Sequence, residues 1–265
     1  MTNKFKLFMM KESDMIDLGI MRYFLVSEVI QSDAGKFIYQ NKYAHEILAR
    51  FKMTDCKSFS TPTEPSLKLH KDDEEREVDN IYFKEIVGSL VYLTSTSPDI
   101  LYVVSLISRY KEKSTEMHLN AAKRVLRYVK GIVDYGVFYK KDIDVNFVGY
   151  TYSNYAGDID DRKSTSGYVF MFNSSVISWL SKKQQIVTLS TTEVEFVAAT
   201  SSASQTLWLR NMFKILKNEQ KDPTIINCDN MSTIKLSRNP VMHINVHFHF
   251  FQAFMQGKED RVVVL

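Results

Sequence analysis

The sequence has little of what marks a disulfide-stabilised, secreted or membrane-spanning protein. It contains 2 cysteines among 265 residues. Cys56 and Cys228 lie far apart, without the spacing of a disulfide framework or a zinc site. No run of about 18 apolar residues occurs, so no membrane span is expected. The first residues lack the apolar core and cleavage site of a secretion signal. We therefore expect an intracellular protein, in the cytoplasm or the nucleus.

A strong excess of one charge is also missing. The formal net charge is +3, which indicates a nucleic-acid partner only if basic residues gather on one face. The apolar share of 45% and the charged share of 25% are ordinary for a globular protein. The length permits one large domain or two small ones, each with a buried core.

The C-terminal half shows an ordered series of strand and helix patterns. Short aromatic and β-branched runs separated by turn residues predict an antiparallel meander over 146–150, 167–172 and 175–180. A helical pattern covers 191–217, and Ser190 and Glu193 before and within it have the spacing of a capping box. Thr224–Cys228 then predicts a buried strand that stops at Asp229. Three strands, a helix, a strand and a helix, in that order, are typical of a ribonuclease H fold.

Several long blocks carry a family resemblance. GDIDDRKSTSGYVF, ISWLSKKQQIVTLSTTEVEF and CDN at 228–230 resemble the ribonuclease H region of copia-type LTR-retrotransposon Pol polyproteins. Upstream, DLGIMRYFLVSEVIQSDAGKFIYQ, SPDILYVVSLISRY and HLNAAKRVLRYVKG resemble the thumb and connection that follow the polymerase palm. The Tyr-x-Asp-Asp motif of the polymerase site does not occur, so we expect no polymerase active site in this chain.

The predicted fold class is therefore α/β: a ribonuclease H-like mixed sheet with helices, preceded by a small α+β and helical reverse-transcriptase connection region. The expected division is a thumb-like part at 1–57, a linker at 58–80, a helical connection at 81–140 and a ribonuclease H-like domain at 141–265, truncated at its C-terminus. The expected upstream helices are Lys4–Ile16, Tyr43–Phe51, Phe83–Thr94, Pro98–Tyr110 and Thr115–Lys130, and the expected strands are Met21–Gln31, Lys36–Tyr39 and the edge strand Tyr135–Lys140.

The resemblance implies a two-metal nuclease site. Ribonuclease H enzymes hydrolyse the RNA strand of an RNA/DNA hybrid with two divalent ions, usually Mg²⁺, about 4 Å apart. The family supplies four carboxylates. Two positions match here: Glu195 on the long helix, with Glu193 as the capping glutamate, and Asp229 at the strand end. An alternative role for Asp229 is the N-cap of a helix over 230–237.

The other two carboxylates are missing. The family's first-strand motif places its metal-bridging Asp on Tyr152 and a second Asp on Asn154. A phenol with a pKa of about 10 cannot serve as an anionic ligand at neutral pH. Asp158 and its acidic neighbours fit a hairpin turn better than a metal site. The fourth carboxylate would lie on a final helix, which we expect beyond Leu265, so Mg²⁺ binding is expected to be weakened.

The tail contains a histidine cluster after the Asn-Pro-Val at 239–241. His243 and His247 have helical spacing and His249 follows, but no Glu stands at the zinc-protease position. We therefore do not expect a zinc site there. Val262–Leu265 resembles the last strand of the domain.

Basic residues recur at helical spacing in the predicted helix before the edge strand. Lys123, Arg124, Arg127 and Lys130 could track the phosphates of a hybrid, and Arg162 and Lys163 of the Asp-rich turn are assigned to the same role. A solvated helix face explains the spacing equally well.

Three hypotheses follow. The chain is a catalytically silent remnant of a Pol polyprotein, a module that binds a nucleic-acid hybrid or a protein such as the remainder of Pol without cutting, or a weak metal-dependent nuclease. We favour the first, because lost metal ligands cost orders of magnitude in rate.

Overall fold

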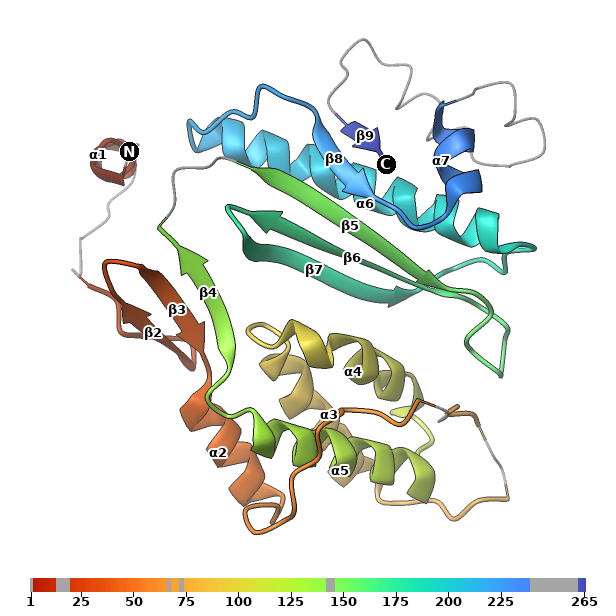
Figure 1. Ribbon diagram of the computed structural model, residues 1–265. Helices are drawn as coiled ribbons and strands as arrows, with labels where there is room; N and C mark the ends of the chain where they lie inside the picture. Colours follow the sequence, from red (N-terminus) through yellow and green to blue (C-terminus); the bar gives the residue numbers. More distant parts are fainter. Residues whose placement is uncertain (1, 13–19, 66–67, 72–73, 142–145, 239–261) are drawn as a thin grey trace.

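The computed structural model describes residues 2–12, 20–65, 68–71, 74–141, 146–238 and 262–265. The described elements form a four-stranded sheet, a group of helices and a five-stranded sheet (Figure 1). The predicted α/β class is confirmed by these two sheets and their helices. None of the helices in the described ranges is long and apolar enough to cross a membrane. The histidine cluster at 243–249 lies outside the described residues.

The chain begins with one helix, followed by three strands of a small antiparallel sheet with the order β1-β2-β3-β4. The fourth strand comes from after the helical region. These elements are α1 (Thr2–Glu12), β1 (Tyr23–Phe24), β2 (Ser27–Gln31), β3 (Gly35–Tyr39) and β4 (Gly136–Lys140). The prediction of one strand over Met21–Gln31 is wrong, because Leu25 and Val26 have φ of 45° and 69° and turn the chain back on itself. Strand β4 is an edge strand as predicted, and it pairs with β3 from about a hundred residues earlier.

The helices between these strands share one hydrophobic core. They are α2 (Asn41–Arg50), α3 (Asn80–Leu93), α4 (Leu101–Ile107) between the short 3₁₀ turns η1 (Pro98–Ile100) and η2 (Ser108–Tyr110), and α5 (Glu116–Gly131). Their predicted positions are confirmed within a few residues. Asp79 caps α3 by accepting from the backbone N–H of Ile81 at 2.8 Å. The core is formed by side chains such as Phe83, Ile86, Leu90, Ile107 and Leu126, all fully buried.

The second sheet has the order β7-β6-β5-β8-β9. Its elements are β5 (Phe147–Asn154), β6 (Thr165–Phe172), β7 (Ser175–Lys183), α6 (Thr191–Ile215), β8 (Thr224–Asn227), α7 (Met231–Arg238) and β9 (Val262–Val264). Strands β5, β6 and β7 form the predicted meander, β8 pairs in parallel with β5, and β9 pairs in parallel with β8. This is the predicted ribonuclease H-like arrangement, with each meander strand extending two to four residues beyond its apolar run.

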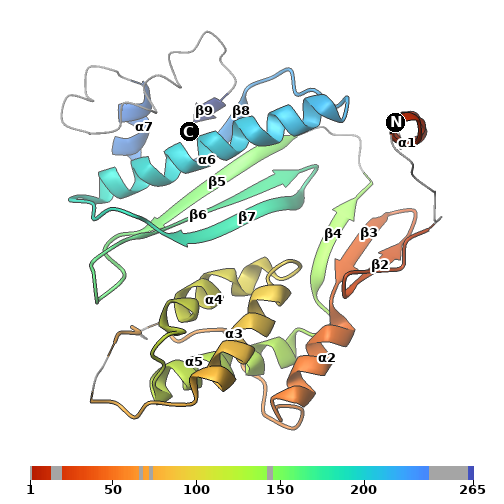
Figure 2. The same ribbon diagram turned by 180° about the vertical axis from the view of Figure 1, so that it is seen from behind.

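The two faces of this sheet contact different helices. Figure 1 shows α6 along one face of the meander and α4 on the other side, and Figure 2 shows the same arrangement from behind. Phe170 points toward α6, where it joins a buried cluster with Leu209. Trp179 points the other way and donates from its indole N–H to the carbonyl of Thr94 at 2.9 Å. The sheet is thereby joined to the helical region through its second face.

Candidate functional site

Three side chains of types that can bind a metal ion come together where α6 faces the end of β8. One ligand atom each from Glu195, Cys228 and Asp229 lies within 4.8 Å of the others. Strand β8 pairs in parallel with β5 and ends at Asn227, so the next two residues lie at the edge where α6 begins. The predicted pair Glu195 and Asp229 is therefore placed together, and Cys228 is a third member that the sequence did not indicate as a ligand.

Glu195 is the buried member of the cluster. Its side chain is 8% exposed, and its Oε2 atom has no hydrogen-bond partner among the described residues. Burial raises its pKa, the charge of Asp229 adds to this, and the adjacent Ser153 opposes it. Glu193, two residues earlier, is used differently: its carboxylate accepts from the Leu189 N–H at 2.7 Å, as expected of a capping glutamate.

Asp229 is not the N-cap residue of the helix that follows it. Asn230 takes that role for α7, since its side-chain oxygen accepts from the Thr233 N–H at 2.9 Å. The alternative interpretation of Asp229 as the N-cap is therefore wrong. Asp229 is exposed, so the cluster is buried on the Glu195 side and open to solvent on the Asp229 side.

Strand β5 adds no carboxylate to the cluster. Alternation along the strand places Thr151 and Ser153 toward α6 and places Tyr152 on the α4 side. Tyr152 is 51% exposed, and its pKa is raised by partial burial and by the neighbouring Tyr102, Glu195 and Asp229. The tyrosine hydroxyl is therefore neutral at physiological pH and supplies no anion.

Tyr152 instead lines an aromatic groove of about 400 Å³ between α4 and the sheet. Tyr102, Tyr150 and Trp179 line the same groove, with Leu101 at its helical side. Tyr150 is 46% exposed, so flat aromatic surface faces solvent here. The groove and the carboxylate–thiol cluster are thus neighbouring features that meet at strand β5.

The donor set does not match two Mg²⁺ ions. Magnesium requires oxygen ligands in near-octahedral geometry, and a pair of ions needs bridging and flanking carboxylates to offset their repulsion. The described cluster offers two carboxylates and a thiol, and one of its carboxylates, Glu195, is held in a pocket that disfavours its charge.

The basic residues of α5 are largely engaged within the chain. Arg124 pairs with Glu64 at 2.7 Å and lies over the Phe59 ring at 4.4 Å. Arg127 lies over the same ring at 5.3 Å, and the Lys130 ammonium donates to the carbonyl of Cys56. These contacts hold residues 56–64 against the helix. They account for much of the predicted basic face without nucleic acid.

The Asp-rich hairpin is organised around a buried carboxylate. Asp158, 2% exposed, pairs with Lys183 at 2.6 Å and with Arg109 at 3.0 Å. Lys163 pairs with Asp161 at 3.8 Å, and Arg162 is exposed. The turn interpretation is thus supported, and Arg109 adds a link from the helical region to the second sheet.

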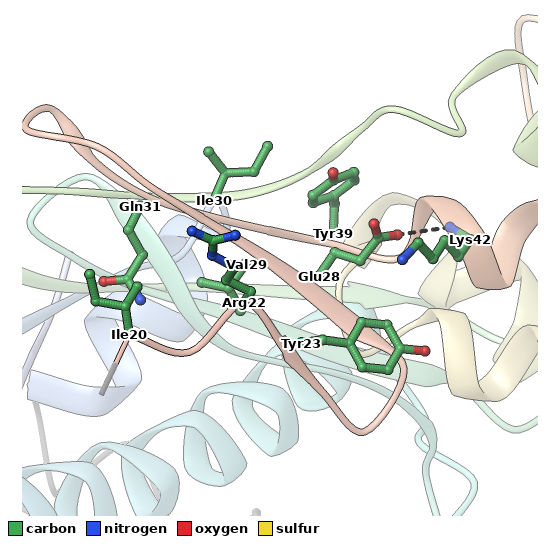
Figure 3. A pocket seen from close by; sticks show the side chains of 9 residues that line it. All are labelled: Ile20, Arg22, Tyr23, Glu28, Val29, Ile30, Gln31, Tyr39 and Lys42. Atoms are coloured by element: carbon green, nitrogen blue, oxygen red, sulfur yellow. Dashed lines mark hydrogen bonds between the residues drawn. The ribbon is translucent and has the colours of Figure 1, made fainter. Parts of the chain in front are cut away.

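A further pocket beside the N-terminal hairpin carries no cluster of reactive groups. Figure 3 shows its lining from Ile20 to Lys42. Its carboxylate, Glu28, accepts from the backbone N–H of Lys42 at 2.9 Å and so caps α2. The Lys42 ammonium lies 5.4 Å from the centre of the Tyr23 ring. These contacts are structural.

Comparison with known proteins places the chain among retroelement sequences. Residues 1–65 match the family described as "Reverse transcriptase (RNA-dependent DNA polymerase)". The chain is 37% identical over 250 residues to a retrovirus-related Pol polyprotein from transposon RE2 of Arabidopsis thaliana, covering 92% of this chain and 17% of that polyprotein. It is 36% identical to an uncharacterised mitochondrial protein of the same plant, over 80% of this chain and 86% of that protein.

A solved foamy viral protease–reverse transcriptase in complex with dsDNA aligns with 89% of this chain and 44% of that structure, with a TM-score of 0.40 and 10% identity.

Proposed function

Because this chain belongs to the copia-type Pol polyprotein family, we propose that residues 141–265 are its ribonuclease H-like region in a form that does not cleave RNA. The chain corresponds to about a fifth of the transposon polyproteins it matches, so the activities of those longer proteins are not transferred to it. The proposal concerns only the site that this chain contains.

One observation supports the proposal above the others. The cluster at the end of β8 holds Glu195 and Asp229, but strand β5 places Ser153 beside Glu195 and Tyr152 on the other face, so it supplies no bridging carboxylate. A nuclease of this class stabilises charge on the attacking and leaving oxygens through two bound ions. Without ligands for both, this transition-state stabilisation is lost, and the expected cost is several orders of magnitude in rate.

The test is cleavage of an end-labelled RNA/DNA hybrid by the purified chain in Mg²⁺ or Mn²⁺. We expect intact RNA with the natural chain and with Glu195→Gln. Glu193→Gln is the matched control, because Glu193 is a capping residue on the same helix turn. Cleavage by the natural chain that survives in Glu193→Gln and disappears in Glu195→Gln would overturn the proposal.

We also propose that the chain binds nucleic acid without cutting it, through the aromatic groove. Tyr102, Tyr150 and Tyr152 offer partly exposed rings on which unpaired bases can stack, at about 1–3 kcal/mol per base. Of the α5 basic residues, we assign phosphate contacts to Lys123 and the exposed Arg127, which line a separate surface pocket beside Phe59. Such contacts are sequence-independent and weaken with salt.

Fluorescence anisotropy with a labelled RNA/DNA hybrid and a labelled single strand measures this binding. We expect saturable, salt-sensitive binding that Tyr150→Ala reduces about tenfold, consistent with the loss of one stacked base. Tyr135→Ala is the control, since Tyr135 is exposed and lies outside the groove. Equal affinity of both variants, or no binding by the natural chain, would contradict the proposal.

A further inference from the structure

We propose that Glu195, Cys228 and Asp229 form a site for one thiophilic divalent cation, of which Zn²⁺ is the representative, in place of two Mg²⁺ ions. The inference rests on the proposed function in one respect: the ion binds where the family's ribonuclease H enzymes hold their catalytic ions. It adds the class of metal that these three side chains bind.

The spacing of the three side chains fits a single ion. Zinc binds thiolate sulfur at about 2.3 Å and carboxylate oxygen at about 2.0–2.2 Å, so tetrahedral ligand atoms lie about 3.5 Å apart. The ligand atoms of Glu195, Cys228 and Asp229 lie within 4.8 Å of one another. Side-chain rotations that move each atom by about 1 Å are enough to close this difference.

The Glu195 carboxylate provides an independent indication of a ligand. Its side chain is more than nine-tenths buried, and its Oε2 atom has no hydrogen-bond partner among the described residues. A buried carboxylate oxygen without a partner costs free energy, which a bound cation would offset. Ser153, on the adjacent strand β5, faces the same carboxylate and favours its charged form. Asp229 is exposed and gives an ion a path to the cluster.

The chemistry of the donors selects against magnesium. A thiolate is a soft ligand that favours zinc-class ions, whereas Mg²⁺ binds oxygen and keeps several waters. Binding converts the Cys228 thiol to a thiolate and releases its proton to solvent. Two carboxylates and one thiolate then carry three negative charges against the two positive charges of one ion. Two Mg²⁺ ions would instead bring four positive charges to the two carboxylates.

The experiment uses Co²⁺ as a spectroscopic substitute for Zn²⁺, titrated into the reduced full chain. We expect a sulfur-to-cobalt charge-transfer band that stoichiometric Zn²⁺ removes and excess Mg²⁺ does not. Cys228→Ser should abolish the band, and Glu195→Gln should weaken cobalt binding at least about tenfold, because loss of a direct ligand costs no less than loss of an outer-shell partner. Cys56→Ser is the matched control and should leave the band unchanged, since Cys56 lies outside the cluster.

The outcomes separate this inference from the proposed function. Cobalt binding without a sulfur band, as expected from the histidines at 243, 247 and 249, overturns the inference. A band that persists in Cys228→Ser and disappears in Cys56→Ser also overturns it. Circular dichroism of each variant establishes that the chain is folded. Mg²⁺-dependent cleavage of a hybrid by the natural chain would contradict the proposed function, whereas the cobalt spectrum tests the metal class separately.

Discussion

Replacement of Asp158 by Asn should destabilise the protein more than any change to an exposed acidic residue of the same hairpin. The Asp158 carboxylate accepts from both Lys183 and Arg109, and its other oxygen accepts from the Asp160 N–H at 3.0 Å. Because Arg109 lies on η2 and Lys183 on β7, this carboxylate joins the helical region to the second sheet. An Asn side chain at this position keeps a carbonyl oxygen that accepts from the Asp160 N–H. Its amide N–H₂ group, however, would face the two cations Lys183 and Arg109.

The expected loss follows from the burial of the three groups. The side chains of Asp158, Arg109 and Lys183 are 1%, 13% and 27% exposed. Removing one partner of a buried ion pair costs about 3–5 kcal/mol, because the remaining charge is left without compensation. Arg109 retains Thr165 as an acceptor, and Lys183 retains Asp161 at 2.8 Å. Because these contacts remain, we expect the free energy of unfolding to fall by about 3 kcal/mol, near the lower end of that range.

Urea unfolding followed by circular dichroism measures this loss. Asp161→Asn is the control: its side chain is 39% exposed, and exposed pairs contribute less than about 1 kcal/mol. Burial by itself would raise the pKa of Asp158, but Lys183 and Arg109 outweigh this and lower it. The stabilisation is therefore present above the unfolded-state pKa of about 3.9 and is lost as the pH falls through the folded-state value. A loss below about 1 kcal/mol at neutral pH, or equal losses in both variants, would refute the reasoning.

Two further substitutions test buried titratable groups. Burial lowers the pKa of His118, and the Nδ1 atom of this residue accepts from the Thr115 N–H at 3.1 Å. The stabilisation that the neutral imidazole contributes is therefore present above about pH 6.5, the pKa of an unfolded histidine, and is lost as the pH falls below that value. His118→Gln keeps a capping-box side chain and should reduce the drop in melting temperature between about pH 7 and pH 5; an unchanged drop would contradict this. Burial raises the pKa of Glu195, so its contribution is present at low pH and lost as the pH rises through the folded-state value. Glu195→Gln should therefore increase stability by about 1 kcal/mol at neutral pH without metal, measured by urea unfolding; a decrease would contradict it.

Most elements of the fold could be predicted from local pattern. Apolar periodicity located the helices of the core and all three meander strands, and Ser190 marked the start of α6, where its Oγ accepts from the Glu193 N–H at 3.1 Å. The predicted strands were too short, because polar residues such as Ser153 and Asn154 continue the ladder with β6. The hairpin at Leu25 and Val26 was missed because apolar residues with positive φ give no turn signal.

The candidate site shows what motifs and what packing each contribute. Glu195 and Asp229 were identified from their motifs, and the structure places them together. Cys228 was dismissed because it has no second cysteine at ligand spacing, although its position directly before a strand-end Asp was a usable signal. The spacing of basic residues on α5 did not reveal that Arg124 forms an ion pair with Glu64 and lies over the ring of Phe59.

The sequence by itself determined the family and the order of the elements, and it predicts that Tyr152 and Asn154 stand where the family has carboxylates. These features depend on residue identity and on patterns that repeat every few residues. The tertiary structure decided that Cys228 lies beside Glu195, and that Tyr152 faces α4 rather than α6. The physical reason is that strand alternation tells which residues share a face. Which helix covers that face depends on packing between segments far apart in the chain.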